Sequence, residues 1–340
     1  MSRVNRQILL RKRPIGVPSA DDFLTAETSA GTPGPGEVLL ENLYLSIDPA
    51  IRGWMSEAKS YLPPIRIGEP VRSGTLSRIV ESNAEGWPVG QVVQALAAWE
   101  SFSVVPSQSL HGKVRPIEGI PLSGMLSVLG GTGLTAYFGL LEVGRPKKGE
   151  TVVVSAAAGG VGSIVGQIAK LKGCRTVGLT GSDEKCAWLV DALGYDTAIN
   201  YKTPDLRAAL KDACPEGIDV FFDSVGGEIL NTALARLHYR GRIAVCGAIS
   251  QINEAELPPG PSNYLQLLAK SARMQGFTTL DFASRYDQAR AELANWILEG
   301  RIRYCDEIVE GLESAPLHFL RLFSGEHRGK LMVQLANVEV

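Results

Sequence analysis

The distribution of apolar and polar residues divides the chain into two regions. From about residue 121 to about residue 300, short uncharged runs rich in β-branched residues alternate with longer stretches in which apolar residues recur every three or four positions. The first pattern is typical of buried strands and the second of amphipathic helices. Strands are therefore expected at residues 151–155, 175–179, 197–201, 218–223 and 241–247, and helices at residues 163–172, 183–193, 205–214 and 229–237.

Strands and helices that alternate in this way predict an α/β fold with a doubly wound parallel Rossmann sheet. Ligands of such sheets bind beyond the carboxyl ends of the strands. Three further helices are expected in the same region, at residues 127–143, 264–274 and 286–299. We assign residues 121–310 to this α/β domain.

The first 118 residues follow a different pattern. Short apolar runs such as residues 38–40 and 92–96 are separated by glycine- and proline-rich turns at residues 31–36, 63–70 and 86–90. This spacing is typical of a β-rich, barrel-like domain. Strands and helices no longer alternate regularly near the end of the chain, where a last strand is expected at residues 331–335. Residues 311–340 are therefore expected to complete the β-rich domain formed by residues 1–120.

A turn made only of small residues follows the first strand of the α/β region. The turn leads into the next helix through Gly159, Gly160, Val161 and Gly162. Small residues let a pyrophosphate approach the backbone, and the unpaired N–H groups at the helix start favour its negative charge. Strand, turn and helix in this order predict a dinucleotide site. Ala157 replaces the usual first glycine, and a tight turn without a ligand is the alternative interpretation.

The end of the second strand indicates which dinucleotide binds. NAD sites place an acidic residue there to hold the ribose 2′-hydroxyl. Here the strand ends in Thr180, Gly181 and Ser182, which are small and uncharged, and Lys185 follows. A neutral strand end beside a cation suits a 2′-phosphate, so the sequence favours NADP(H) over NAD(H). A solvated lysine on the helix surface is the alternative for Lys185.

Composition and charge narrow the class of partner. The chain of 340 residues is 45% hydrophobic and 21% charged with a net charge of −2, which favours neither a nucleic-acid nor a membrane partner. Two long uncharged stretches, residues 119–141 and 151–169, are interrupted by turn-forming residues and are interpreted as buried core. The five cysteines form no CxxC pair, so a reduced, cytoplasmic protein is expected. The basic N-terminus leaves a mitochondrial presequence as the weaker alternative.

The sequence also argues against a catalytic metal. The first 120 residues contain no cysteine and one histidine, His111, whereas tetrahedral zinc needs three or four such ligands. The other histidines, His238, His318 and His327, are far apart in sequence and are expected at the surface. No Ser-His-Asp order and no paired carboxylates mark an expected pocket. The chemistry is therefore expected to belong to a bound cofactor.

Taken together, the motifs resemble one family over nearly the whole chain. The matching stretches are residues 45–53, 60–64, 156–162, 165–174, 181–185, 200–202, 225–227, 246–250, 257–261, 273–277 and 329–330. The chain resembles the zinc-independent medium-chain dehydrogenases/reductases of the leukotriene B4 12-hydroxydehydrogenase and prostaglandin reductase type, and within them the bacterial NADPH-dependent curcumin reductases. This resemblance implies a GroES-like β-rich substrate domain and NADPH-dependent reduction of the carbon–carbon double bond of α,β-unsaturated ketones and aldehydes.

The resemblance also implies roles for individual residues. The turn at residues 159–162 corresponds to the pyrophosphate contacts, and Lys185 and Tyr201, with Ser182 beside them, correspond to the 2′-phosphate end. Ser224 stands where relatives have an asparagine, which weakens an expected amide contact to the cofactor. The nicotinamide side corresponds to Cys246, Gly247, Ala248, Ile249, Ser250, Ile252, Phe277, Thr278 and Thr279.

Substrate contacts are marked less clearly. Tyr61 lies on an expected loop and matches a substrate-contacting tyrosine of the family, so it is the first candidate to donate a hydrogen bond to an enolate oxygen. Packing on the neighbouring prolines is its alternative. Tyr264 is the second candidate, although a core position at the start of a helix is favoured for it. Ala50 and Ala269 stand where relatives carry tyrosine, which implies a wider substrate pocket.

The expected partners are a small enone or enal substrate and a second copy of the chain. Members of the family dimerise through the α/β domain, and the apolar segment after residue 245 is a suitable interface. A quinone oxidoreductase or an alcohol dehydrogenase on the same fold remains an alternative, because fold does not determine function. A non-catalytic NADP-binding sensor is the alternative from a different class.

Overall fold

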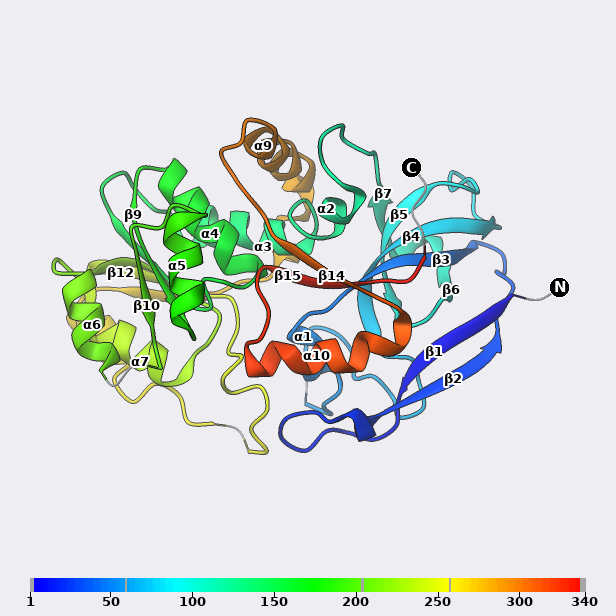
Figure 1. The fold of residues 1–340 in the computed structure, drawn as a ribbon, viewed down its shortest axis with the longest axis horizontal. Helices are drawn as coiled ribbons and strands as arrows, with labels where there is room; N and C mark the ends of the chain where they lie inside the picture. Colours follow the sequence, from blue (N-terminus) through cyan, green and yellow to red (C-terminus); the bar gives the residue numbers. More distant parts are fainter. Residues whose placement is uncertain (1–2, 59, 203–204, 257, 337–340) are drawn as a thin grey trace. The chain divides into compact units, whose positions relative to one another are not determined.

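The computed structural model describes residues 3–58, 60–202, 205–256 and 258–336, which form two compact units (Figure 1). The β-rich unit comprises the described residues of Met1–Leu126, Asp306–His327 and Leu331–Val340. The α/β unit comprises those of Ser127–Cys305 together with Arg328–Lys330.

The α/β unit contains a six-stranded sheet in which all paired strands run parallel. The strand order is β10-β9-β8-β11-β12-β13, so the chain builds outward from β8 in one direction and from β11 in the other. This order is that of a doubly wound dinucleotide-binding sheet and confirms the predicted fold class. The strands are β8 (Thr151–Val154), β9 (Arg175–Thr180), β10 (Thr197–Asn200), β11 (Ile218–Asp223), β12 (Leu237–Val245) and β13 (Arg273–Gly276).

Helices connect these strands and cover the sheet on both faces (Figure 1). Right-handed crossovers place α4 and α5 on one face and α6 and α7 on the other. Leu210 of α6 and Leu234 of α7 are buried with Phe221 and Ile243 of the strands, so the apolar stripes of these helices form the core of their face. The helices are α3 (Gly131–Phe138), α4 (Gly160–Leu171), α5 (Asp183–Asp191), α6 (Leu206–Ala213), α7 (Gly227–Ala235) and α9 (Tyr286–Leu298).

The helix predicted at residues 127–143 has the wrong bounds. α3 begins only at Gly131, and the chain then continues as the π-helical turn η3 (Gly139–Gly144). A Cβ atom on Gly133 would lie 1.7 Å from the carbonyl oxygen of Val128, so the preceding segment folds back tightly against the helix. This close approach depends on a backbone contact, which the apolar pattern does not reveal.

The helix predicted at residues 264–274 is also wrong. Only α8 (Gln266–Ala269) is helical, and the chain then forms β13, the sixth strand of the sheet. Residues of β13 pair in parallel with β12, from Arg273 beside Arg242 to Gly276 beside Val245. Pairing with a distant strand overrides the local helical pattern in this segment.

The β-rich unit contains a seven-stranded sheet and a two-stranded hairpin. The main path of the sheet is β14-β15-β3-β4-β5-β7, and β6 pairs with β3. The hairpin consists of β1 (Val4–Leu10) and β2 (Phe23–Ser29). The sheet strands are β3 (Glu37–Ser46), β4 (Arg72–Ser82), β5 (Val92–Ala98), β6 (Phe102–Pro106), β7 (Leu110–Lys113), β14 (Asp306–Glu310) and β15 (Lys330–Gln334); the short helices are α1 (Ala50–Trp54) and α2 (Leu122–Leu126).

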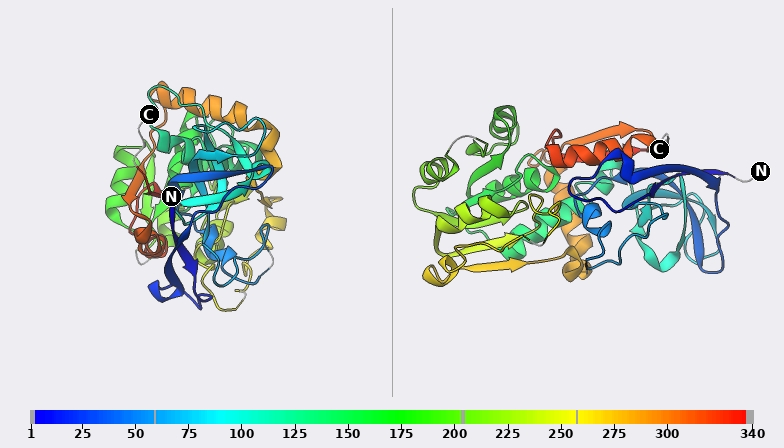
Figure 2. Two further views of the ribbon diagram at one scale, coloured as in Figure 1. Left: turned by 90° about the vertical axis from the view of Figure 1, so that its right-hand side faces the viewer. Right: turned by 90° about the horizontal axis from the view of Figure 1, so that it is seen from below.

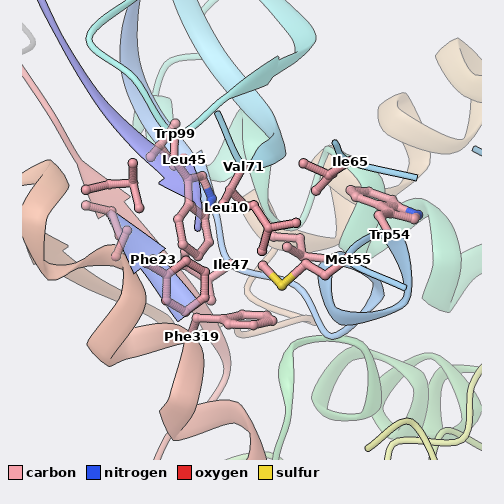
Figure 3. Close-up of a cluster of buried hydrophobic side chains, with 14 of the residues drawn as sticks. Leu10, Phe23, Leu45, Ile47, Trp54, Met55, Ile65, Val71, Trp99 and Phe319 are labelled. Atoms are coloured by element: carbon pink, nitrogen blue, oxygen red, sulfur yellow. The ribbon is translucent and has the colours of Figure 1, made fainter. Parts of the chain in front are cut away.

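An aromatic core joins the two ends of the chain within the β-rich unit (Figure 3). The rings of Phe23 and Trp99 stack with their centroids 5.7 Å apart, and Phe319 of α10 (Ala315–Ser324) meets Trp99 edge-on at 5.7 Å. Helix α10 consequently lies beside the N-terminal strand β1, as the views of Figures 1 and 2 both show. Burial of these aromatic side chains and the pairing of β15 with β3 both hold the C-terminal segment in this unit.

Helix α4 lies unusually close to the side chain of Tyr195. The Tyr195 hydroxyl donates a hydrogen bond of 2.6 Å to the carbonyl oxygen of Gly162, and a Cβ atom on Gly166 would lie 1.9 Å from the tyrosine ring. We expect Gly166→Ala to destabilise the protein by about 1–3 kcal/mol, because the fully packed ring has no space to move into. Thermal unfolding of the variant should show a lower midpoint than that of wild type.

The matched control is Gly131→Ala at the exposed start of α3. A Cβ atom there would meet no atom within 4 Å, so this variant should be neutral or slightly more stable because alanine favours the helix. Equal midpoints for Gly166→Ala and wild type would show that the Tyr195 contact does not constrain α4.

Candidate cofactor site

The centre of the candidate site is the place where β8 and β11 lie side by side in the α/β sheet. The chain leaves β8 toward β9 and leaves β11 toward β12, so the connections after these two strands diverge. Such a divergence leaves a crevice beyond the carboxyl ends of the strands, where dinucleotides bind in this class of sheet. The residues predicted at five of the strand ends therefore lie along one edge, and the end of β13 adds a sixth.

The small-residue turn after β8 is shaped by close backbone contacts. Ala156 adopts the left-handed conformation with φ of 47°, and Gly159 is the N-cap of α4. A Cβ atom on Gly162 would lie 2.5 Å from the Ala156 carbonyl oxygen, so a larger residue would force the turn open. The first N–H groups of the 12-residue helix α4 follow directly, and they have no partner within the helix. The predicted turn is thus built as an anion-binding helix start requires.

The alanine that replaces the first glycine of the motif faces away from this turn. Ala157 is fully buried, and its N–H donates to the carbonyl oxygen of Leu179 at 3.0 Å. A Cβ atom on Gly178 of β9 would lie 3.0 Å from the Ala157 Cβ. The methyl group of Ala157 therefore occupies space that a glycine in the neighbouring strand leaves open, and the departure from the motif leaves the helix start accessible.

The ends of β9 and β10 bring the residues expected near a 2′-phosphate together. Ser182 is the N-cap of α5, and its hydroxyl accepts a hydrogen bond of 3.3 Å from the Lys185 N–H. A Cβ atom on Gly181 would lie 3.0 Å from the Tyr201 hydroxyl and 3.3 Å from Cε of Lys202. Gly181 thus lets both side chains approach the strand end, and Lys202 is a cation that sequence analysis did not name as a site residue.

The two acidic residues of this segment are each engaged by another side chain. The Asp183 carboxylate accepts a hydrogen bond of 2.8 Å from the Asn200 amide, and Glu184 forms an ion pair of 3.5 Å with Arg328. Both residues also lie in the first turn of α5, where carboxylates interact favourably with the helix dipole.

The ends of β11 and β12 form a second pair of linked loops. The Ile249 N–H donates to the Ser224 carbonyl oxygen at 3.1 Å, and the Ser250 hydroxyl donates to the Val225 carbonyl oxygen at 2.6 Å. Burial raises the pKa of the Cys246 thiol to about 11, and the Ser224 side chain hydrogen-bonds to it. The serine that replaces the family asparagine is therefore turned toward a neutral thiol. Three further predicted residues belong to this loop: Gly247 and Ala248 lie between Cys246 and Ile249, and Ile252 follows Ser250.

The segment after β13 reaches the same edge, but Phe277 is packed into the protein. A Cβ atom on Gly139 of the π-helical turn would lie 2.3 Å from the Phe277 ring, and the ring meets Phe222 edge-on at 6.2 Å. The N–H of Thr278 donates to the side chain of Asp281 at 3.1 Å and begins η4 (Thr279–Arg285). The packed ring of Phe277 thus fixes the chain just after β13. The hydrogen bond between Thr278 and Asp281 fixes the residues that follow.

A short stretch near the C-terminus also lies against the small-residue turn. The N–H of Gly329 donates to the Ala158 carbonyl oxygen at 2.8 Å and forms a parallel bridge with Gly159. A Cβ atom on Gly160 would lie 3.3 Å from Lys330, which is 6% exposed. Sequence analysis noted the Gly-Lys pair but did not place it in the site. Only this long-range contact identifies it.

The two tyrosines considered for substrate contact belong to different units. Tyr61 follows α1 in the β-rich unit, is 59% exposed and meets Trp54 edge-on at 6.2 Å. Tyr264 precedes α8 in the α/β unit and is 58% exposed, so the favoured interpretation as a core residue is wrong. The helix α8 begins only at Gln266, so Tyr264 lies in the turn before it.

The described residues contain neither a metal-ligand cluster nor a membrane-spanning helix. No group of three or more His, Cys, Asp or Glu side chains that could hold a metal ion occurs among them. Within the same residues, no helix has the length and apolar character needed to cross a membrane.

Comparison with known proteins places the chain in a family. Residues 6–112 match the family model described as the N-terminal domain of oxidoreductase, and residues 160–295 match that described as zinc-binding dehydrogenase. The NADPH-dependent curcumin reductase of Escherichia coli is 42% identical, with 98% of this chain and 97% of that protein covered. Prostaglandin reductase 1 of Bos taurus is 44% identical, with 96% and 97% covered.

A solved structure agrees with these sequence matches. The structure of CurA from Vibrio vulnificus in complex with NADPH is 41% identical and superposes with a TM-score of 0.91, covering 98% of this chain and 100% of that one. The fold and the full-length identities define an NADP-dependent oxidoreductase. The chain belongs to the medium-chain dehydrogenase/reductase superfamily, in the group of the curcumin and prostaglandin reductases.

Proposed function

We propose that the protein uses NADPH to reduce the carbon–carbon double bond of α,β-unsaturated ketones and aldehydes. The observation that carries this proposal is full-length similarity to curcumin and prostaglandin reductases, combined with a strand end after β9 that has no acidic residue. A neutral strand end suits the 2′-phosphate of NADPH, because a carboxylate there would repel it.

The cofactor is assigned to the edge of the sheet described above. The pyrophosphate binds at the turn formed by residues 159–162 and the first N–H groups of α4. Lys185, Tyr201 and Lys202 hold the 2′-phosphate, whereas the nicotinamide lies along the loops that follow β12 and β13. Each of these segments begins at the carboxyl end of a strand in the same parallel sheet, which supports a single continuous cofactor site.

The proposed reaction needs little acid–base chemistry from the protein. When bound, NADPH would supply the hydride for the β-carbon of the enone and leave as NADP⁺, the negative charge would spread to the carbonyl oxygen, and a proton from solvent would complete the reduction at the α-carbon. A hydrogen-bond donor then stabilises the enolate. The exposed Tyr61 hydroxyl is the first candidate for this role, and Tyr264 is the second. We infer that no catalytic metal takes part, because the described residues offer no ligand cluster for one.

We further propose that the protein is a cytoplasmic homodimer. β13 lies at the edge of the six-stranded sheet, and all four of its residues are exposed. The adjoining segment exposes Tyr264, Leu265 and Leu268, the last by 79%. An uncovered strand edge beside exposed apolar side chains is a suitable surface for a second copy. The five cysteines are free thiols, which supports a reducing compartment.

The reaction is tested by product analysis. Incubation with NADPH and a simple enone should yield the saturated ketone with its carbonyl intact, and a chelator should leave the rate unchanged. Mass spectrometry and NMR identify the product. Allylic alcohol as the main product would mean carbonyl reduction, faster turnover of simple quinones would favour a quinone oxidoreductase, and NADPH binding without turnover of any substrate would favour a sensor.

The same assay tests the donor. Tyr61→Phe should lower kcat by about 10²-fold while leaving the Kd for NADPH nearly unchanged, because the hydroxyl acts only on the developing charge. An unchanged kcat would not contradict the proposed reaction, but it would mean that Tyr264 or the cofactor ribose is the hydrogen-bond donor.

Cofactor choice is tested at Lys185. Lys185→Ala should weaken NADPH binding by about 1.5–3 kcal/mol and NADH binding much less, because only NADPH carries the 2′-phosphate. The matched control is Lys211→Ala in the last turn of α6, where the chain returns toward the amino end of β11. Titration of both cofactors checks the difference, and an equal loss for NADPH and NADH would remove the phosphate role.

Assembly is tested by light scattering at micromolar concentration. The wild-type protein should have twice the chain mass of 36.5 kDa. Leu268→Glu should shift the mass toward the monomer, because it places a charge in the proposed interface. Leu317→Glu changes a leucine of α10 that is 63% exposed and should leave the mass unchanged. A monomeric wild-type protein would contradict the proposal.

A further inference from the structure

A buried carboxylate stands at the point where β8 and β11 diverge. Asp223 is the last residue of β11 and is 1% exposed. Its Oδ1 accepts hydrogen bonds from the Ser155 hydroxyl at 2.9 Å, the Val225 N–H at 3.0 Å and the Gly226 N–H at 3.1 Å. The Gly226 N–H also reaches Oδ2 at 3.2 Å. These uncharged donors offset part of the cost of burying the carboxylate.

The same residue links two further strand ends through its backbone. The Asp223 carbonyl oxygen accepts from the Cys246 N–H at 2.7 Å and from the Gly247 N–H at 3.2 Å, both just beyond β12. The Ser155 hydroxyl, besides donating to the carboxylate, accepts from the Ser224 N–H at 2.8 Å. Asp223 therefore joins the ends of β8, β11 and β12.

These are the segments in which the backbone adopts unusual conformations. Ala156, next to Ser155, is left-handed, and Gly226 and Gly227 have φ of 73° and 56°. A Cβ atom on Gly226 would lie 2.9 Å from Gln251 Oε1, so the loop after β12 packs directly against the turn after β11. Backbone segments of this kind keep one conformation only when surrounding contacts fix it.

We propose that Asp223 is a positioning residue of the cofactor site, which holds the ends of β8, β11 and β12 in the arrangement that the dinucleotide requires. Its carboxylate fixes the turn after β11 and, through Ser155, the start of the small-residue turn. Its carbonyl oxygen fixes the start of the loop assigned to the nicotinamide. This inference rests on the proposed NADPH site and adds a residue that supports the site without touching the cofactor.

The experiment separates positioning from general stability. Asp223→Ala removes every side-chain contact and should raise the Kd for NADPH by about tenfold or more, the equivalent of one lost charge-assisted hydrogen bond. Asp223→Asn keeps an oxygen that can replace Oδ1, so its Kd should lie between those of wild type and Asp223→Ala. Ser155→Ala removes the hydrogen bonds of the Ser155 hydroxyl to the Asp223 carboxylate and the Ser224 N–H but keeps the carboxylate on the turn after β11, so it should also raise Kd, by a smaller factor.

The matched control lies at the other end of the same strand. The Asp219 carboxylate accepts the Thr151 N–H at 2.8 Å, at the amino ends of β11 and β8. Asp219→Ala should lower the unfolding midpoint of the cofactor-free protein but leave the Kd for NADPH within about twofold, because its lost contacts, to the Thr151 N–H and to His238, lie at the amino ends of the strands. Cofactor titrations and thermal unfolding without cofactor are recorded for every variant.

The outcomes are distinct. A Kd that follows the order wild type, Asp223→Asn, Asp223→Ala supports the inference when Asp219→Ala binds normally. Should Asp223→Ala fail to fold, Asp223→Asn and Ser155→Ala carry the test. The inference alone would be overturned if wild type binds NADPH and the Asp223 and Ser155 variants have the same Kd as wild type. It would also be overturned if Asp219→Ala raises the Kd as much as Asp223→Ala does. Wild-type protein that bound no NADPH would overturn the cofactor assignment and this inference with it.

Discussion

The parallel pairing of β8 with β11 is the constraint on which the α/β unit depends. Val152, Val153 and Val154 pair with Val220, Phe221 and Phe222, and all six side chains are buried. Once these apolar strands lie together, their connections must diverge, since one helix leads toward β9 and the other toward β12. The divergence of the connections at their carboxyl ends is a consequence of chain topology, and the polar and small residues that follow these strands form the proposed cofactor site.

Most of the α/β fold could be predicted from the sequence because its strands are short, apolar and separated by regular helices. β11 has the predicted bounds, and α4 and α5 differ from prediction only near their ends. The errors lie where a distant contact decides the conformation. β13 forms because β12 offers it a partner, and the end of α3 becomes π-helical where Gly139 packs against Phe277. Neither contact leaves a periodic signal.

The candidate site could be predicted in part for the same reason. Gly159, Gly160 and Gly162 form a local motif whose spacing is enough to predict a pyrophosphate site. Gly329 and Lys330 join them only through a bridge across about 170 residues of sequence, and Lys202 becomes a candidate only because Gly181 admits it to the strand end. Asp223 was visible as a strand end, but its role as the acceptor that joins three strands depends on hydrogen bonds that no residue pattern contains.

A strained backbone conformation and a buried carboxylate occur at the same strand ends. A left-handed alanine at residue 156 costs about 1–3 kcal/mol, and a buried carboxylate at residue 223 must give up its hydration. The Ser155 hydroxyl lies between them: it donates to the carboxylate and accepts from the backbone of the next turn. The left-handed alanine and the buried carboxylate would each destabilise an isolated loop. Here the hydrogen bonds of Ser155 connect the two segments that contain them. For the proposed cofactor site, this means that an edge fixed by such contacts need not order itself when a flexible dinucleotide binds, so less of the interaction energy is lost to conformational entropy.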